Sequence, residues 1–290
     1  MDNIDSCYYY NEVTINKRKS VLIDVAIVLT MDHKTLEDEN IKQIIERVPS
    51  NRLIIQFNKG FKKCDKKHLI KQQSNYDLCD ATETALKYAF DELKLENVLI
   101  LEDDAFFVDN IEEDLMIVKD FLKRTPFTVY SLGTFGYIAN PLNILLGDEK
   151  HIKVYKYGGS HACIYNKNFL KSFKSFKCEH IDIYSKNIVN SFVYYKPLVI
   201  QYLTNSSLNY ESWGTFNHLL YYFFKNICGM FKQYPPEYKD FRRLNYMMST
   251  ISLVVLFLVI VIILYGFIII SKLCFGKTMT SKSLLYKHLI

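Results

Sequence analysis

The most constraining feature of this sequence is a long uncharged, apolar stretch near its C-terminus. No charged residue occurs between Arg243 and Lys272, and the segment from Ser249 to Ile270 is rich in Val, Ile and Leu. A helix needs about 20 apolar residues to cross the hydrocarbon core of a bilayer. A buried core helix, the alternative, is usually shorter and keeps a polar stripe. We therefore predict one transmembrane helix over residues 248–271.

The rest of the chain has the composition of a globular protein. Charged residues make up 23% of the 290 residues and hydrophobic residues 49%, which are ordinary proportions for a folded domain. The net charge of +5 comes from basic residues scattered along the chain, without an arginine-rich stripe. We therefore expect a membrane protein that has no nucleic-acid partner.

The cysteines and the chain ends favour a cytosolic position for the domain before the helix. The seven cysteines form no CxxC pair and are odd in number, which favours reduced thiols over a disulfide framework or a zinc site. The polar N-terminus lacks the features of a signal peptide. Insertion after synthesis would then leave a single-pass protein with a C-terminal anchor. Basic residues flank the helix almost equally, and use of the glycosylation sequence Asn205-Ser206-Ser207 would reverse this orientation.

Apolar strands alternate with amphipathic helices along residues 21–214. This alternation predicts an α/β fold with a mostly parallel sheet and flanking helices. Asp80 followed by Glu83 has the spacing of a helix-capping box. Residues 1–20 resemble an N-terminal lead-in, and 272–290 form a short basic tail. The aromatic juxtamembrane segment 215–247 fits either an amphipathic helix at the membrane surface or a last core helix. The expected strands are Val21–Thr30, Arg52–Phe57, Asn97–Leu101, Phe127–Leu132, Lys153–Tyr157, Ala162–Tyr165, Phe192–Tyr195 and Leu198–Tyr202, and the expected helices are Leu36–Val48, Asp77–Glu96, Glu112–Lys123 and Asn168–Phe176.

Three consecutive carboxylates follow the apolar run Asn97–Leu101. Glu102, Asp103 and Asp104 repel one another unless a cation neutralises them, and hard oxygen ligands suit Mg²⁺ or Mn²⁺. Open α/β sheets bind ligands outside the carboxyl ends of their strands. Because alternate residues of an extended segment point the same way, Glu102 and Asp104 would face one metal ion, with Asp103 turned elsewhere. The alternative is an acidic turn that caps the helix near Glu112.

Two further stretches carry candidate site residues. The sequence Gly158-Gly159-Ser160-His161 lets the backbone come close to a ligand, and His161 would bind a phosphate, a sugar hydroxyl or a metal. The alternative is a hairpin turn with an incidental histidine. Asp182 lies between two isoleucines and is a candidate general base. Its alternative role is to cap the start of a helix.

The order of these motifs resembles that of the family 25 glycosyltransferases, which include lipooligosaccharide and collagen galactosyltransferases. The resemblance covers about residues 21–207. Cys163 replaces the family's usual aromatic residue, and the first strand runs into Leu29–Lys34 instead of Asn-Leu and an arginine-containing loop. The matching residues are Leu99–Asp104, Gly159-Ser160-His161-Ala162-Cys163, His180-Ile181-Asp182, Pro197, Val199, Gln201, Ser206 and Ser207.

The resemblance implies a GT-A fold and a metal-dependent hexosyltransferase. The resemblance implies that a nucleotide-sugar donor, UDP-linked, would bind across the sheet, with Mn²⁺ or Mg²⁺ held by Glu102 and Asp104 against its diphosphate. Asp182 would be the base of an inverting transfer to a glycan, lipid or protein acceptor. Asp103 would contact the ribose or a nearby lysine. The residues implied in binding donor or substrate are Asp103, Gly159, Ser160, His161 and Gln201.

Two alternative functions remain open at this point. One is an inactive, membrane-anchored structural or interaction protein on a glycosyltransferase-like fold, because Cys163 and the first loop depart from the family pattern. The other is a metal-dependent phosphoryl hydrolase. Such a hydrolase normally draws acidic residues from several strand ends, whereas this sequence has one acidic cluster directly after a strand.

Overall fold

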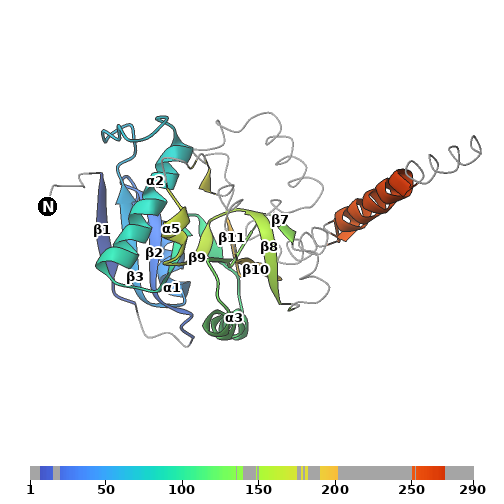
Figure 1. The fold of residues 1–290 in the computed structure, drawn as a ribbon. Coiled ribbons are helices and arrows are strands. Elements are labelled where there is room, and N and C mark those ends of the chain that lie inside the picture. Colours follow the sequence, from blue (N-terminus) through green and yellow to red (C-terminus); the bar gives the residue numbers. More distant parts are fainter. Residues whose placement is uncertain are drawn as a thin grey trace, which may run out of the picture. The chain divides into compact units, whose positions relative to one another are not determined.

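The chain divides into two compact units, Met1–Met248 and Ser249–Ile290. A computed structural model describes residues 7–15, 20–134, 136–139, 148, 150–174, 178, 180–181, 190–201, 250–251 and 253–271. The first unit is built from layers of strands and helices (Figure 1).

A nine-stranded sheet forms the framework of the described part of the first unit. Its strand order is β1-β3-β2-β4-β9-β6-β10-β8-β7, and a second, two-stranded sheet pairs β11 with β5. The strands are β1 (Tyr8–Val13), β2 (Ile23–Met31), β3 (Ser50–Asn58), β4 (Asn97–Glu102), β5 (Ala105–Phe107), β6 (Val129–Ser131), β7 (Gly136–Ala139), β8 (His151–Gly158), β9 (Ala162–Asn166), β10 (Ser191–Tyr194) and β11 (Val199–Gln201).

Helices cover both faces of this sheet because the central strands are apolar on both faces. Successive side chains of β2 alternate between two core clusters: Val25 and Ile27 pack with residues of α2, whereas Ala26 and Val28 pack with residues of α1 and α3. The period of two along a strand produces this alternation. The helices are α1 (Glu39–Arg47), α2 (Ser74–Lys87), the π-helical turn η1 (Tyr88–Glu92), α3 (Glu112–Arg124) and α5 (Phe169–Ser172).

The sheet is mixed, with one run of three parallel strands next to the edge strand β1. Strand β2 runs parallel to β3 and β4, and β6 runs parallel to β10. The pairs β1–β3, β4–β9, β6–β9, β8–β10 and β7–β8 are antiparallel. The predicted α/β class with flanking helices is therefore confirmed, and the predicted parallel arrangement applies to the neighbouring strands β3, β2 and β4.

Two local predictions differ from the structure. The lead-in over residues 1–20 contains the edge strand β1, which pairs with β3 along its whole length. Asp80 and Glu83 do not form a capping box, because α2 begins at Ser74 and both residues lie inside it. Asp80 instead accepts a hydrogen bond of 2.6 Å from the hydroxyl of Tyr8. The pairing of β1 with β3 and the contact of Tyr8 with Asp80 are long-range features that no local pattern reveals.

Two disulfide bonds correct the expectation of reduced thiols. Cys7 pairs with Cys64 and Cys79 pairs with Cys178, with Cα–Cα distances of 5.5 and 6.1 Å. Both distances lie in the ordinary range for disulfides. The partners are 57 and 99 residues apart in the sequence. Spacing alone does not reveal pairs of this kind, because only the folded chain brings them together.

The described part of the second unit is one helix, Leu253–Ser271 (Figure 1). Its 19 residues are long and apolar enough to cross a membrane. Large apolar side chains such as Phe257 and Ile262 are exposed along it. The aromatic segment 215–247 and the basic tail 272–290 lie outside the described residues.

Candidate functional site

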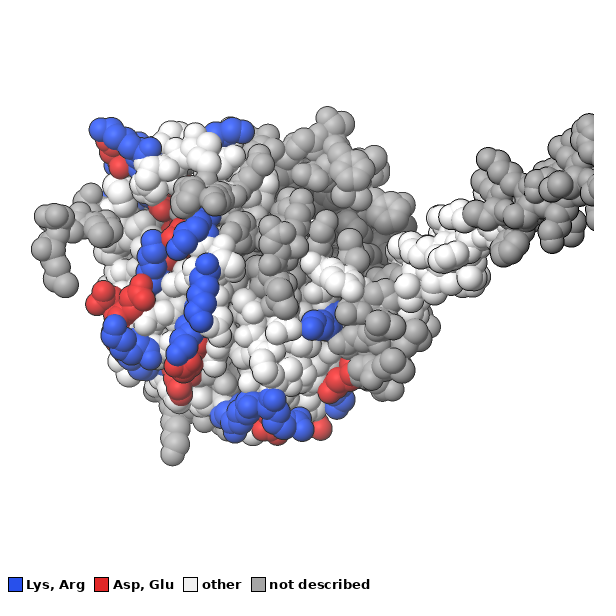
Figure 2. All heavy atoms as spheres, in the orientation of Figure 1, with Lys and Arg blue, Asp and Glu red and all other residues white. Residues whose placement is uncertain are grey.

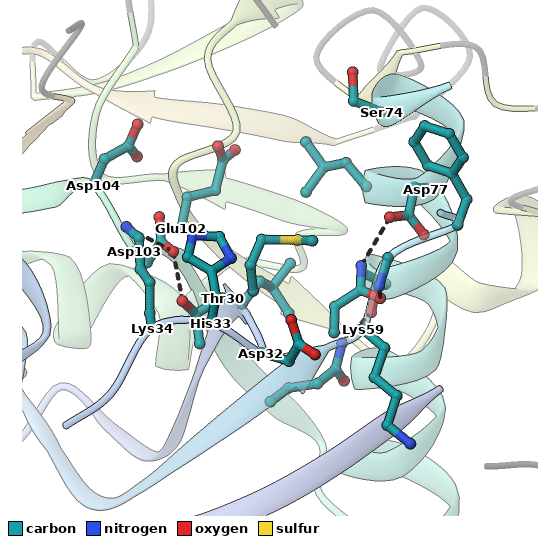
Figure 3. Close-up of a pocket in the computed structure, with 18 of the residues that line it drawn as sticks. Thr30, Asp32, His33, Lys34, Lys59, Ser74, Asp77, Glu102, Asp103 and Asp104 are labelled. Atoms are coloured by element: carbon teal, nitrogen blue, oxygen red, sulfur yellow. Dashed lines mark hydrogen bonds and ion pairs between the residues drawn. The ribbon is translucent and has the colours of Figure 1, made fainter. Parts of the chain in front are cut away.

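A pocket lies at the carboxyl ends of β2, β3 and β4 (Figure 3). Its volume is about 800 Å³, within the range of small-molecule sites. Parallel strands point their carboxyl ends to one edge of a sheet, where open α/β folds bind ligands. The wall also includes the loop after β3 and the first turns of α2. Polar residues of the wall include Thr30, Asp32, His33, Lys34, Asn58, Lys59, Lys63, Asp77, Glu102, Asp103, Asp104 and Gln201.

The acidic triplet occupies the turn between β4 and β5, which places all three carboxylates in the pocket wall. Glu102 is the last residue of β4, and its backbone N–H donates to the carbonyl of His161 at 3.0 Å. Its side chain accepts a hydrogen bond of 2.9 Å from the hydroxyl of Ser160. The segment before β9 therefore fixes the backbone and the side chain of Glu102.

Asp103 points away from its two acidic neighbours (Figure 3). Its Oδ2 accepts a hydrogen bond of 2.5 Å from Thr30 and lies 3.0 Å from the ammonium of Lys34. Both partners come from the end of β2 and the loop that follows it. The resemblance placed Asp103 against the ribose or a lysine, and in this structure a lysine is its partner. Sequence reasoning missed Thr30 and Lys34, because nothing local links them to a strand about 70 residues later.

Gln201 joins the other two carboxylates of the triplet. Its amide nitrogen donates to Asp104 Oδ2 at 2.9 Å and lies 3.4 Å from Glu102 Oε2. The pairing of β11 with β5 sets this position, since Gln201 lies opposite Ala105. Glu102 and Asp104 therefore face one point, as the alternation of side chains predicts for residues two apart.

The carboxyl group of Asp104 is enclosed, and its Oδ1 has no hydrogen-bond partner among the described residues. Burial and, to a lesser extent, the negative charge of Asp103 raise the pKa of Asp104 to about 7, although the hydrogen bond from Gln201 opposes the rise. A cation at this point would neutralise the negative charge of the ionised carboxyl group.

The His161 side chain packs behind the triplet and does not line the pocket. It is buried, and its Nε2 lies 3.3 Å from the carbonyl of Val199 in β11. Burial lowers the pKa of His161 to about 4, so the imidazole is neutral at pH 7. Gly159 has a φ of +93°, a backbone conformation that favours glycine. In this structure the Gly-Gly-Ser-His stretch holds the acidic turn in place through the hydrogen bonds of Ser160 and His161 with Glu102.

Gly133 permits the close contact between β11 and the strand end at β6. A Cβ at this position would lie 1.8 Å from the carbonyl oxygen of Val199 and 2.7 Å from Nε2 of His161. Backbone N–H groups of Leu198 and Val199 donate to the carbonyl of Leu132 at 2.7 and 3.3 Å. The small residue therefore lets β11 approach closely enough to place Gln201 beside the triplet.

The opposite wall of the pocket is basic and rests on a buried ionic cluster. Lys59 and Lys63 line this wall, and Lys63 pairs with Asp32 at 2.9 Å. Beneath them the side chain of Lys66 is fully buried. It pairs with Asp77, Asp80 and the hydroxyl of Tyr8, and donates to Asn58 at 3.0 Å. The sequence suggests that the lysine-rich loop after β3 is exposed. In the structure, the buried side chain of Lys66 ties this loop to β1 and α2.

The charge around the pocket is divided between the two walls. The triplet carboxylates lie at the turn after β4 with Lys34 beside them, whereas Lys59 and Lys63 come from the loop after β3, where Asp32 and Asp77 also line the pocket (Figure 3). Elsewhere on the face shown in Figure 2, basic and acidic side chains are interspersed. An anionic ligand that carries a divalent cation would match both walls.

The oxygen atoms near Gln201 fit a hard divalent cation. Glu102 and Asp104 supply carboxylate oxygens at one point, and Asp104 Oδ1 is available for coordination. In the described part of the chain, no group of three or more His, Cys, Asp or Glu residues gathers to hold a metal. Among the described residues, further ligands at this point would therefore be neutral side chains, with water or a bound phosphate beside them.

Asp182, the candidate general base, lies outside the described residues, as do Ser206 and Ser207. Neighbouring His180 is described and exposed, and Ile181 is buried. The role of Asp182 stays a prediction.

No protein-family model and no curated protein sequence matches the chain. Among solved structures, the chain is similar to A197 from STIV, with 11% sequence identity and a TM-score of 0.39 over 62% of this chain and 85% of that one. It is also similar to mouse xyloside xylosyltransferase 1 in its apo form, with 11% identity and a TM-score of 0.24 over 53% of this chain and 70% of that one. Likenesses this distant leave the geometry of the pocket as the basis for a functional proposal.

Proposed function

We propose that this chain is a metal-dependent glycosyltransferase that uses a nucleotide-sugar donor. The observation that supports this most is the convergence of Glu102 and Asp104 on Gln201 at the edge of an 800 Å³ pocket. Two carboxylates at one point suit a cation, and the lysines on the other wall suit a polyanion. A nucleoside diphosphate bound through Mn²⁺ or Mg²⁺ combines the two.

The proposed reaction transfers a hexose from a UDP-linked donor to a glycan, lipid or protein acceptor. Glu102 and Asp104 would hold the cation, which stabilises the negative charge that develops on the leaving diphosphate. Lys34 holds Asp103 away from this point and leaves the cation site to its two neighbours. Asp182 is the proposed base that takes the proton of the acceptor hydroxyl in an inverting attack. The apolar helix would keep the domain beside membrane-bound acceptors.

The test is donor cleavage by the full-length protein purified in detergent. The protein is incubated with a panel of UDP-hexoses and Mn²⁺, with and without mixed glycan acceptors, and UDP is measured. We expect UDP release that EDTA abolishes and that falls at least a hundredfold in Asp104→Asn. The matched control is Asp120→Asn, since Asp120 is exposed on α3 and does not line the pocket.

UDP release at the same rate in Asp104→Asn and in the wild type would rule out this site as the catalytic centre. Absence of release with every donor would contradict the enzyme proposal and leave the structural protein as the better reading. Release of phosphate from simple phosphate esters, without cleavage of nucleotide sugars, would favour the hydrolase.

A further inference from the structure

We propose that Gln201 is a third oxygen ligand of the cation site, reached by a half-turn of its side-chain amide. In this structure the amide NH₂ group lies between the carboxylates of Glu102 and Asp104. When a cation binds there, the same amide presents its carbonyl oxygen instead. This inference rests on the cation site of the proposed function but not on sugar transfer.

The first argument is the place of Gln201 in the fold. Its backbone pairs with Ala105, the residue directly after the acidic triplet. Its amide nitrogen is 2.9 Å from Asp104 Oδ2 and 3.4 Å from Glu102 Oε2. A group this close to both carboxylates is within reach of any ion that the two carboxylates share.

The second argument is the chemistry of the amide group. Its oxygen and nitrogen differ little in size, and rotation about the last torsion of glutamine exchanges them at small cost. The NH₂ edge donates hydrogen bonds to both carboxyl groups. The carbonyl edge is an ordinary ligand for hard divalent cations, which take oxygens from Asn and Gln side chains as well as from carboxylates.

The third argument is the incomplete set of acidic ligands. No group of three or more His, Cys, Asp or Glu residues gathers to hold a metal in the described ranges. Asp104 Oδ1 is buried and has no hydrogen-bond partner among the described residues, so one oxygen of this carboxyl group is left for a further partner. With Gln201, three side chains would supply oxygens and leave the remaining positions of an octahedron for diphosphate and water.

The experiment measures binding of Mn²⁺ alone to the full-length protein in detergent, by calorimetry and by the loss of the free Mn²⁺ electron paramagnetic resonance signal. We expect Gln201→Leu to weaken Mn²⁺ binding about tenfold and Gln201→Glu to strengthen it about tenfold. Gln201→Met keeps the length of the side chain and is expected to match Gln201→Leu. Melting curves in EDTA show whether each variant is folded, and Gln201→Met replaces Gln201→Leu if the latter is not.

Mn²⁺ binding in Gln201→Leu and Gln201→Met that equals or exceeds that of the wild type would overturn the inference, since the amide would then only compete with the cation. Undiminished binding in Asp104→Asn would overturn the cation site itself. If Mn²⁺ binding depends on Gln201 but no UDP is released from any donor, the inference stands and the proposed transferase function fails.

The disulfides carry a second inference, independent of the pocket. We infer that the first unit folds in an oxidising compartment and lies on the side of its membrane that faces away from the cytosol. Cys7–Cys64 ties the residue before β1 to the loop after β3, and Cys79–Cys178 ties α2 to the chain beyond α5. Disulfides form and persist in oxidising compartments and are rare in the cytosol.

Burial makes both bridges part of the fold and not accidental surface contacts. Cys79 and Cys178 are fully buried, and Cys64 is nearly so. Two separate pairs with suitable Cα distances are less readily explained by chance than one. The cytosolic orientation expected from the sequence rested on the polar N-terminus, the short tail after the helix and reduced thiols, and the two bridges contradict the last of these.

The test uses the full chain expressed in eukaryotic cells and recovered in sealed microsomes. Protease added outside the vesicles is expected to leave the first unit intact until detergent is added. Alkylation before and after reduction, followed by peptide mass spectrometry, is expected to show all four paired cysteines protected until reduction. Digestion of the first unit in sealed vesicles would overturn the inference, as would alkylation of these cysteines without reduction.

Discussion

At the residue scale, the turn after β4 places three neighbouring carboxylates in different surroundings. Ser160 and Gln201 contact Glu102, Lys34 and Thr30 contact Asp103, and Asp104 is enclosed. The alternation of side chains along an extended segment was enough to predict that Asp103 points away from Glu102 and Asp104. The partners could not be predicted, because they come from the ends of strands that are distant in the sequence.

Asp104 should make the metal-free protein less stable at alkaline pH. Its folded pKa of about 7 exceeds the ordinary value of 3.8. Stability from this group is therefore fully present below about pH 4 and is lost as the pH rises through 7. In EDTA at pH 8, Asp104→Asn is expected to be more stable than the wild type by up to about 4 kcal/mol. Urea unfolding at pH 4.5 and pH 8 measures this, and an equal difference at both pH values would contradict it.

His151 should make the protein less stable in acid. The ring stacks on Phe121 with centroids 3.9 Å apart, and Nδ1 lies 2.7 Å from the hydroxyl of Tyr130. Burial lowers the pKa of His151 to about 4 from an ordinary 6.5. Its contribution is therefore present above pH 6.5 and is lost as the pH falls towards 4, by about 3 kcal/mol. His151→Phe, which keeps the stacking, is expected to flatten the dependence of the unfolding free energy on pH between 7 and 4. An unchanged slope would assign the acid sensitivity to other groups.

At the element scale, prediction succeeded where a strand or helix is defined by its own apolar pattern. Strands β2 and β4 are continuous apolar runs, and α3 has helical spacing, so their positions agree closely with expectation. The edge strand β1 was missed because its exposed polar residues resemble a loop. The pairing of β11 with β5 was missed because short strands carry little pattern, and their register is set by the packing around Gly133.

Gly133→Ala should disturb the proposed cation site, although Gly133 is not one of its ligands. The added Cβ would meet the carbonyl of Val199, so β11 must shift and carry Gln201 away from Asp104. We expect a loss of roughly 2 kcal/mol in stability and weaker Mn²⁺ binding than in the wild type. Gly266→Ala is the matched control, because a Cβ there meets no atom within 4 Å. Normal Mn²⁺ binding in a folded Gly133→Ala protein would show that the position of β11 does not control the site.

At the scale of the whole molecule, composition predicted the apolar helix but not the covalent links of the domain. Hydropathy is a local property, whereas disulfide pairing depends on which parts of the fold meet. Cys79 lies in α2, and Cys178 belongs to a segment about 100 residues later. The odd number of cysteines suggested reduced thiols, yet an odd count is compatible with two bridges and cysteines such as Cys163 that lie outside them.

Removal of the Cys79–Cys178 bridge should destabilise the domain strongly. The bridge closes a loop of 99 residues, and chain-entropy reasoning assigns about 5 kcal/mol to a loop of that length. The double variant Cys79→Ser/Cys178→Ser adds two buried hydroxyl groups, so Cys79→Ala/Cys178→Ala is the cleaner test. Cys163→Ala is the matched control, since Cys163 is buried outside both bridges.

Urea unfolding of these variants in detergent, with and without reductant, separates the contribution of the bridge from that of side-chain packing. We expect the double alanine variant to lose several kcal/mol and reductant to affect it less than the wild type, because only Cys7–Cys64 remains to be broken. Reductant should affect Cys163→Ala and the wild type alike. If reductant leaves the wild type unchanged while all four cysteines become alkylated, the fold does not depend on its bridges. In that case the disulfides would be a consequence of the compartment and not a requirement of the structure.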